Sequence, residues 1–182
     1  MHFLLDNLIA TLVAGSVFLI LIGINHRNQQ AAFEAVNFYA MRQQQIAFID
    51  MLKRDMQNVT RLETATEQGN EFILFVTEPS TSNEIRVIYR REPVIGTDYV
   101  RIQRYEIQGS SQVAAGRSAD TISHWQIVAR NAASQPVVDP TAATQVYINF
   151  EMGAPFREGR IVKRARWDAA FRPPMLQPNV SI

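Results

Sequence analysis

An apolar run near the N-terminus limits what this chain can fold into more than any other feature of the sequence. From Leu8 to Ile24, only Thr11 and Ser16 carry polar side chains, and no charged residue interrupts the run. About 20 apolar residues in a helix are needed to cross the hydrocarbon core of a bilayer. Since both hydroxyls can bond back to carbonyl groups of their own helix, we expect a membrane-inserted helix here.

The residues around the run argue against a removable signal peptide. Such a peptide needs a basic start and a small-residue cleavage site after the apolar core. This chain starts Met1-His2-Phe3, its first charged residue is Asp6, and the run is followed by NHRNQQ at 25–30, without such a site. We therefore expect the helix to be retained. The nearest basic residue, Arg27, follows the run, which by the positive-inside rule favours a cytoplasmic C-terminal side.

The carboxylate of Asp6, at the mouth of the run, has two interpretations from the residues alone. It could lie at the membrane interface in the first turn of the helix, where the positive end of the helix dipole favours an anion. It could instead be buried among apolar groups and paired with a cation, such as the free α-amino group of a neighbouring chain. The residues leave both interpretations open.

The helix is expected to continue well beyond the apolar run. No proline precedes Pro79, and strong helix formers dominate residues 25–60. Apolar residues recur there at steps of three and four, which is the pattern of an amphipathic helix. These positions are Phe38, Met41, Phe48, Ile49, Leu52, Met56 and Val59. We predict one helix over 3–61, with 1–24 as the transmembrane or filament-core segment and 25–62 as its amphipathic continuation.

Residues 70–182 have the pattern of an antiparallel β domain with an extended tail. Three β-rich runs at 71–78, 84–92 and 98–108 predict a meander. Two more strands are expected at 121–129 and 144–152, with a proline-containing loop between them. Residues 110–118 look like a loop, 161–171 fit a last strand or a short helix, and 172–182 form a proline-rich tail. The expected fold class is α+β, with a long N-terminal helix packed on an antiparallel sheet.

No arrangement of residues in the sequence points to catalysis. Cysteine is absent, and His2, His26 and His124 lack the spacing of metal ligands. The GxSxG, HExxH and glycine-rich phosphate-binding motifs do not occur. Asp50, Asp55 and Glu63 are expected on a solvated helix face beside basic residues rather than as paired catalytic carboxylates. We therefore expect no enzyme activity, no metal and no cofactor.

The densest basic charge lies near the C-terminus and also has two interpretations. It comprises Arg157, Arg160, Lys163, Arg164, Arg166 and Arg172, with Trp167 among them. Such a cluster could hold nucleic acid through phosphate neutralisation and base stacking. It could also be a solvated strand face whose arginines pair with neighbouring acids, and this second interpretation is favoured. The same interpretation is favoured for the arginines at 86, 90, 91, 101 and 104.

The layout and three local motifs together resemble the type IV pilin superfamily, in particular its minor pilins and minor pseudopilins. FLLDNLIATLVAGSVFLILI (3–22) is similar to the family's mature N-terminus, in which an aromatic residue leads and an acid soon follows. FIDMLKRDMQNVTRL (48–62) resembles the helix end of larger minor subunits, where a Leu-x-x-Asp-hydrophobic pattern occurs. RVIYRREPVIGTDYVRIQRYEI (86–107) resembles their paired strands. The acid is Asp6 here, where the family usually has Glu.

The resemblance implies a structural subunit of a type IV pilus-like or secretion pseudopilus filament. Such a subunit is held in the inner membrane by a single pass, with its sheet domain outside the cytoplasm, before it enters an extracellular filament. Its partners would be membrane lipid, other pilin-like subunits and an inner-membrane assembly platform. The implied assembly residues are Met1, His2, Phe3 and Asp6, with Asp6 neutralising a neighbouring subunit's N-terminus. The alternatives are a single-pass accessory subunit of a larger membrane complex and a DNA-uptake minor pilin.

Overall fold

The computed structural model describes residues 2–78, 82–155 and 161–176. The chain divides into two compact units, Met1–Tyr39 and Ala40–Ile182. Helix α1 (His2–Gln57) begins in the first unit and ends in the second. Among the described residues, the second unit adds an eight-stranded antiparallel sheet. The α+β class expected from the sequence is therefore confirmed.

The first unit is helical throughout its described residues, 2–39. This part of α1 contains a stretch that is long and apolar enough to cross a membrane. Its large apolar side chains between Phe3 and Ile24 are exposed, from 49% at Val17 to 76% at Phe3. The hydroxyl of Thr11 donates to the carbonyl of Asn7, and that of Ser16 to the carbonyl of Val13, both at 2.8 Å. Both hydroxyls are thus satisfied inside the helix, as expected.

Helix α1 ends at Gln57, four residues before the predicted end. The side-chain amide of Asn58 donates to the carbonyl of Arg54 at 2.8 Å, which satisfies one of the carbonyls left unbonded at a helix end. The chain then enters β1 (Val59–Leu62), which pairs antiparallel with β2 (Glu71–Thr77). The helical period predicts Val59 in the helix, because an apolar residue three positions after Met56 fits that period. The pairing with β2 places it in a strand instead.

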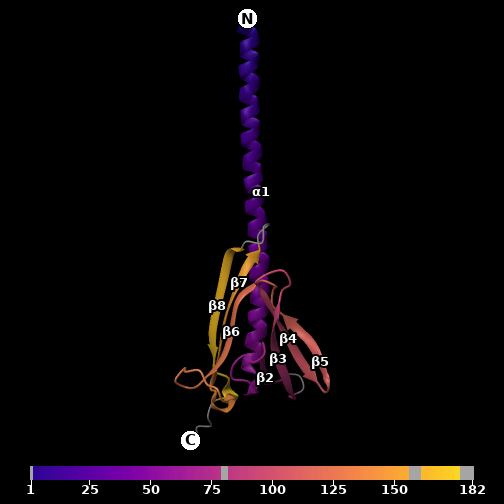
Figure 1. Ribbon diagram of the computed structural model, residues 1–182, viewed down its shortest axis with the longest axis vertical. Helices are drawn as coiled ribbons and strands as arrows, with labels where there is room; N and C mark the ends of the chain where they lie inside the picture. Colours follow the sequence, from indigo (N-terminus) through magenta and orange to yellow (C-terminus); the bar gives the residue numbers. More distant parts are fainter. Residues whose placement is uncertain (1, 79–81, 156–160, 177–182) are drawn as a thin grey trace. The chain divides into compact units, whose positions relative to one another are not determined.

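The remaining strands follow in sequence and confirm the predicted meander and the strands after it. They are β3 (Glu84–Pro93), β4 (Val100–Gln108), β5 (Ser111–Arg117), β6 (Ile122–Arg130), β7 (Gln145–Pro155) and β8 (Ile161–Phe171). Short 3₁₀ turns occupy Pro140–Ala142 and Pro174–Leu176. The sheet order is β1-β2-β3-β4-β6-β7-β8, and β5 pairs with β4. Within the second unit, β6–β8 lie on one side of α1 and β3–β5 on the other (Figure 1).

Two segments differ from what the sequence suggested or left open. Residues 111–117, expected as a loop, form β5, which is joined to β4 by the two residues Gly109 and Ser110. Gly109 has φ of 62°, a left-handed conformation that glycine adopts without steric cost and that a type II′ hairpin turn needs at this position. Residues 161–171, open between strand and helix, form β8 as the antiparallel partner of β7.

The core of the second unit lies between α1 and the sheet. Met41, Phe48, Leu52 and Met56 are buried, so the predicted apolar stripe is confirmed at these positions. The ring of Phe48 contacts two aromatic rings of the sheet, at centroid distances of 6.0 Å from Trp125 and 5.5 Å from Phe150. Full burial of one such side chain contributes about 1.5–3 kcal/mol. The buried face of α1 therefore packs on β6 and β7 through these rings.

Strands β5 and β6 both pair with β4, and they do so along different parts of it. Strand β4 pairs with β6 through Val100 and Ile122, and with β5 over residues 103–108. Farther along β6, the backbone N–H of Ala129 donates to the carbonyl of Ala65 in the β1–β2 connection at 2.6 Å. The β4–β5 hairpin therefore leaves the path of the main sheet, and β5 forms an edge of its own.

Candidate functional site

Asp6 lies on the apolar part of α1, among exposed apolar side chains. Because α1 begins at His2, Asp6 is its fifth residue, and the first turn contains no acidic residue. Asp6 therefore lies just beyond the first turn of the described helix, and its place at a membrane interface stays a prediction. The attraction of the helix dipole falls off within that turn, so it stabilises this carboxylate little.

The other predicted assembly residues are only partly described. Phe3 is exposed, whereas His2 is described through its backbone alone, and Met1 lies outside the described residues. In the described part of the chain, Asp6 forms no ion pair. An ionised carboxylate placed in hydrocarbon without a cation is costly. In a membrane or in a bundle of apolar helices, the apolar side chains around Asp6 would be buried. The charge of Asp6 would still need a cationic partner there.

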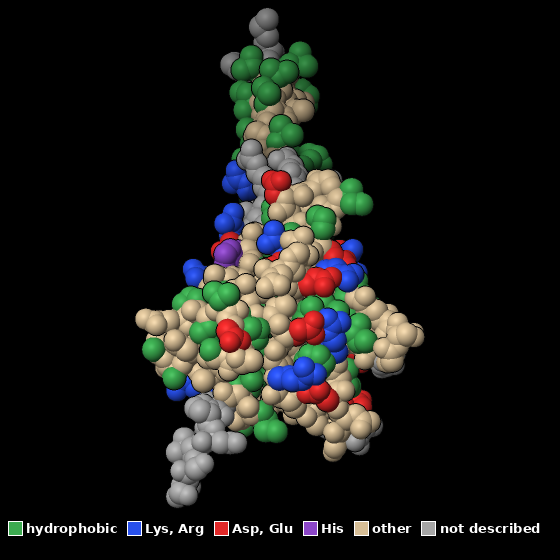
Figure 2. Space-filling model, turned by 60° about the horizontal axis from the view of Figure 1, so that its bottom comes forward, with side chains coloured by type: hydrophobic (Ala, Val, Ile, Leu, Met, Phe, Trp, Pro, Cys, Tyr) green, Lys and Arg blue, Asp and Glu red, His purple; other side chains and the backbone are tan. Residues whose placement is uncertain are grey.

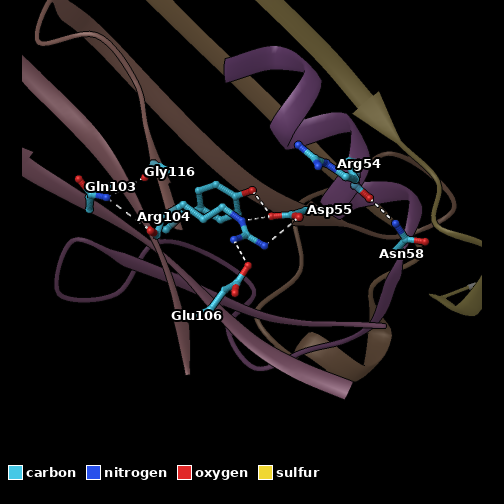
Figure 3. A network of polar contacts seen from close by, with 8 residues as sticks. Arg54, Asp55, Asn58, Gln103, Arg104, Glu106 and Gly116 are labelled. Carbon is cyan, nitrogen blue, oxygen red and sulfur yellow. Dashed lines mark hydrogen bonds and ion pairs between the residues drawn. The ribbon is translucent and has the colours of Figure 1, made fainter. Parts of the chain in front are cut away.

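A buried ionic cluster joins the end of α1 to the sheet, and the sequence interpretation had missed it (Figure 3). The Arg104 guanidinium on β4 donates to both carboxylate oxygens of Asp55, from Nε at 2.6 Å and from Nη2 at 3.1 Å. The hydroxyl of Tyr89 on β3 donates to Oδ2 of Asp55 at 2.5 Å. Arg104 also donates through Nη1 to Glu106. Asp55, Arg104 and Tyr89 are 5%, 7% and 1% exposed.

The protonation states of this cluster follow from burial and mutual contact. Burial raises the pKa of Tyr89 well above its usual value, and the Asp55 carboxylate raises it further, so the phenol stays a donor. For Arg104, burial lowers the pKa, but the hydrogen bonds to Asp55 and Glu106 outweigh it and the pKa rises. The guanidinium therefore stays charged throughout the physiological pH range.

Asp55 had been expected on a solvated helix face, and this expectation is wrong. It lies three residues after Leu52 and seven after Phe48, which places all three on the same helix face. Glu63, grouped with it, follows β1 and pairs with Arg86 at 2.6 Å. The helical period alone could therefore have identified Asp55 as buried. A buried acid on such a face needs a cation from the sheet, because an unpaired buried charge is strongly unfavourable.

A cavity of about 550 Å³ adjoins this cluster. Its wall is formed by the last turns of α1 and by parts of β2–β5. Apolar members of the lining are Ala47, Phe48, Met51, Val76, Ile85 and Ala115, and charged members are Arg54, Asp55, Glu78, Arg104, Glu106 and Arg117. Gly116 completes this wall, and a Cβ there would come within 2.4 Å of the Met51 sulfur.

The predicted C-terminal basic cluster is not brought together with its aromatic residue. Trp167 lies on the face of β8 that packs inward, with its ring 5.3 Å from that of Phe150, whereas Arg164 and Arg166 alternate with it and are exposed. Arg164 pairs with Glu151 at 3.1 Å. Arg172 is exposed after β8, Lys163 is described through its backbone alone, and Arg157 and Arg160 lie outside the described residues.

The arginines of β3 and β4 form ion pairs with acids of β2, of β3 and of the β1–β2 connection. Arg86 pairs with Glu63, Arg90 with Glu71, Arg91 with Glu67, and Arg101 with Glu92. Figure 2 shows such basic and acidic side chains interspersed over the second unit. The expectation of a solvated face with paired arginines is confirmed for these four, and Arg104 is the exception because its pair is buried.

Among residues 2–78, 82–155 and 161–176, no three His, Asp or Glu side chains are grouped so that they could hold a metal ion. The long apolar N-terminal helix and the antiparallel sheet are compatible with a pilin-like fold. Comparison of the chain with protein-family models, with curated proteins and with solved structures found no match.

Proposed function

We propose that this chain is a structural subunit of a filament of the type IV pilus or secretion pseudopilus kind. The observation that carries the proposal is the uncovered apolar surface of α1 between Phe3 and Ile24. A helix that is apolar all round is stable in lipid or among other apolar helices, but not in water. A filament subunit needs both environments in turn, first as a membrane anchor and then in the filament core.

Transfer from lipid to a helical core changes little in hydrophobic free energy, because lipid tails are as apolar as leucine side chains. Packing and polar contacts must then decide where each subunit stops. In our proposal Asp6 supplies that contact by pairing with the α-amino group of a neighbouring subunit. A buried ion pair with one partner missing is strongly unfavourable. The pair would therefore fix the offset between neighbouring subunits along the filament.

The other two functions find less support. An accessory membrane subunit would explain the exposed helix equally well, but it gives Asp6 no cation. A DNA-uptake role would need bases to stack near the basic side chains, whereas Trp167 packs against Phe150 on the opposite face of β8 from Arg164 and Arg166.

Replacing Asp6 by Ala is expected to leave membrane insertion intact and to abolish filaments. The substitution removes one charge from the apolar helix, so insertion becomes no less favourable. Subunits, however, lose the contact that sets their offset. The measurement is electron microscopy of sheared surface material with an antibody to this chain, together with membrane fractionation. Asp50→Ala, at an exposed carboxylate of the same helix, is the matched control. Normal filaments with Asp6→Ala would refute the proposal.

A further inference from the structure

Two guanidinium groups at the cavity have no ion-pair partner among the described residues. Arg54 lies in the last turn of α1 and Arg117 ends β5; both line the cavity and are exposed. In contrast, Arg104 in the same wall is bound to acids. Arg54 also complements the negative end of the helix dipole, but this does not use its N–H donors. The exposed side of the cavity can therefore accept an anion.

The cavity is apolar beside these cations. Met51 of α1 and Ile85 of β3 are half-buried members of its lining. A small inorganic anion would leave this apolar surface in contact with water. A ligand that matches the whole cavity carries a carboxylate next to an apolar group, because apolar contact and charge pairing then stabilise it together.

Among the described residues, no strand pairs with the outer edge of β5, and β5 borders the same cavity through Ala115, Gly116 and Arg117. Strand β5 pairs with β4 on one side, and residues 111–115 are all exposed. Natural edge strands are protected by charges, prolines or shortness. Two other edge strands are protected in these ways, because β8 carries several charged residues and β1 is only four residues long. In β5, by contrast, the segment SQVAAG (111–116) has neither a charged residue nor a proline. Its pairing with β4 skips Ala115, so the regular part of the edge is 111–114. This edge offers main-chain donors and acceptors, which favours a peptide over a small carboxylate.

We propose that the edge of β5 and the adjoining cavity form a docking site for an extended, acidic segment of a partner polypeptide. The segment adds to β5 as a further strand, and alternate side chains on one of its faces enter the cavity. An acidic side chain accepts hydrogen bonds from Arg54 and Arg117. An apolar side chain two residues away packs on Met51 and Ile85. The site goes beyond the filament proposal, since it requires neither Asp6 nor the membrane segment.

The test uses the full chain in a neutral detergent and a labelled peptide, Thr-Val-Thr-Asp-Thr-Val-Thr, followed by fluorescence anisotropy. Its Val and Asp side chains share one face when the peptide is extended. Hydrogen bonds to charged groups are strong enough that Arg54→Gln and Arg117→Gln should each weaken binding about 10- to 100-fold. The peptide with Asn in place of Asp should weaken to a similar degree. Arg42→Gln, at an exposed arginine of α1 outside the cavity lining, should leave affinity unchanged.

Two further experiments distinguish binding of a peptide as an added strand from binding of a small ligand in the cavity. N-methylation of alternate peptide bonds, tested in both alternations, should abolish binding in one of them, because one set faces β5. Pentanoate should compete far more weakly than the peptide. The proposal is overturned if no peptide binding occurs up to about 1 mM, or if the Asn peptide binds as well as the Asp peptide. Equal affinity for pentanoate would also overturn it and make the cavity a small-molecule site.

Discussion

Replacing Arg104 by Met should lower the free energy of unfolding of the second unit by about 3–5 kcal/mol. The guanidinium neutralises Asp55, which is 5% exposed, and also contacts Glu106. Without it, two carboxylates face each other in one wall, and the buried one has only the Tyr89 hydroxyl as a partner. Urea unfolding in a neutral detergent, followed by tryptophan fluorescence, measures the effect. Both tryptophans of the chain, Trp125 and Trp167, lie in this unit.

Replacing Asp55 by Leu and replacing Arg104 by Met are expected to lower the free energy of unfolding by unequal amounts. Asp55→Leu leaves Arg104 with its contact to Glu106, so it should lower stability less than Arg104→Met does. The double variant should recover most of the loss, because a buried ion pair replaced by apolar side chains of similar volume is often neutral. The coupling free energy from this double-mutant cycle is the decisive quantity. Arg90→Met removes a half-exposed pair with Glu71 and, as the control, should change stability by about 0–1 kcal/mol. An equally small effect at Arg104 would contradict the assigned role.

The cluster also explains why an acid occurs on an otherwise apolar helix face. Apolar contacts of Phe48, Leu52 and Met56 could be satisfied by several small rotations or shifts of α1 on the sheet. Asp55 reaches the Nε and Nη2 donors of Arg104 together in a single register. Buried polar pairs can select one arrangement in this way, at little gain in stability. We therefore expect the double apolar variant to stay folded but to show broader signals in its NMR spectrum.

The fold could be predicted further than the site because the two depend on different information. Apolar runs and periodicity are local, and they located α1, β2, β3, β4, β6 and β7. The ends of elements depend on pairing with distant residues, which is why Val59 was assigned to the helix although it pairs with Val76. Strand β5 was missed because its small polar residues resemble a loop. Its turn residues, Gly109 and Ser110, nevertheless carried a recognisable hairpin signal.

Candidate site residues were harder to predict, since charge in a sequence does not reveal its partner. Arg104 looked like the other arginines of its region, and only the fold places it 2.6 Å from Asp55, 49 positions earlier. Trp167 stands between basic residues in the sequence, but strand alternation turns it to the other face. The role that we propose for Asp6 involves another molecule, which no property of a single chain reveals.

Replacing Phe48 by Ala should lower the free energy of unfolding of the second unit by about 3–5 kcal/mol, the usual range for a buried aromatic residue. Phe48 is 2% exposed and begins a row of ring contacts that runs through Phe150 to Trp167 on β8. It also lines the 550 Å³ cavity, so its removal enlarges a space that neighbouring side chains do not fill. We therefore expect a value near the upper end of this range.

The same variant separates anchoring from folding. The apolar segment from Phe3 to Ile24 is unchanged, so the protein should stay in the membrane fraction while the near-ultraviolet circular dichroism of its tryptophans weakens. Ile46→Ala, on the same helix but at a side chain that is 46% exposed, should change stability by no more than about 0.5 kcal/mol. Loss of Phe48→Ala from the membrane would mean that the anchor depends on the folded sheet. A stability change as small as that of Ile46→Ala would show that the Phe48 ring contributes little to the packing of α1 on the sheet.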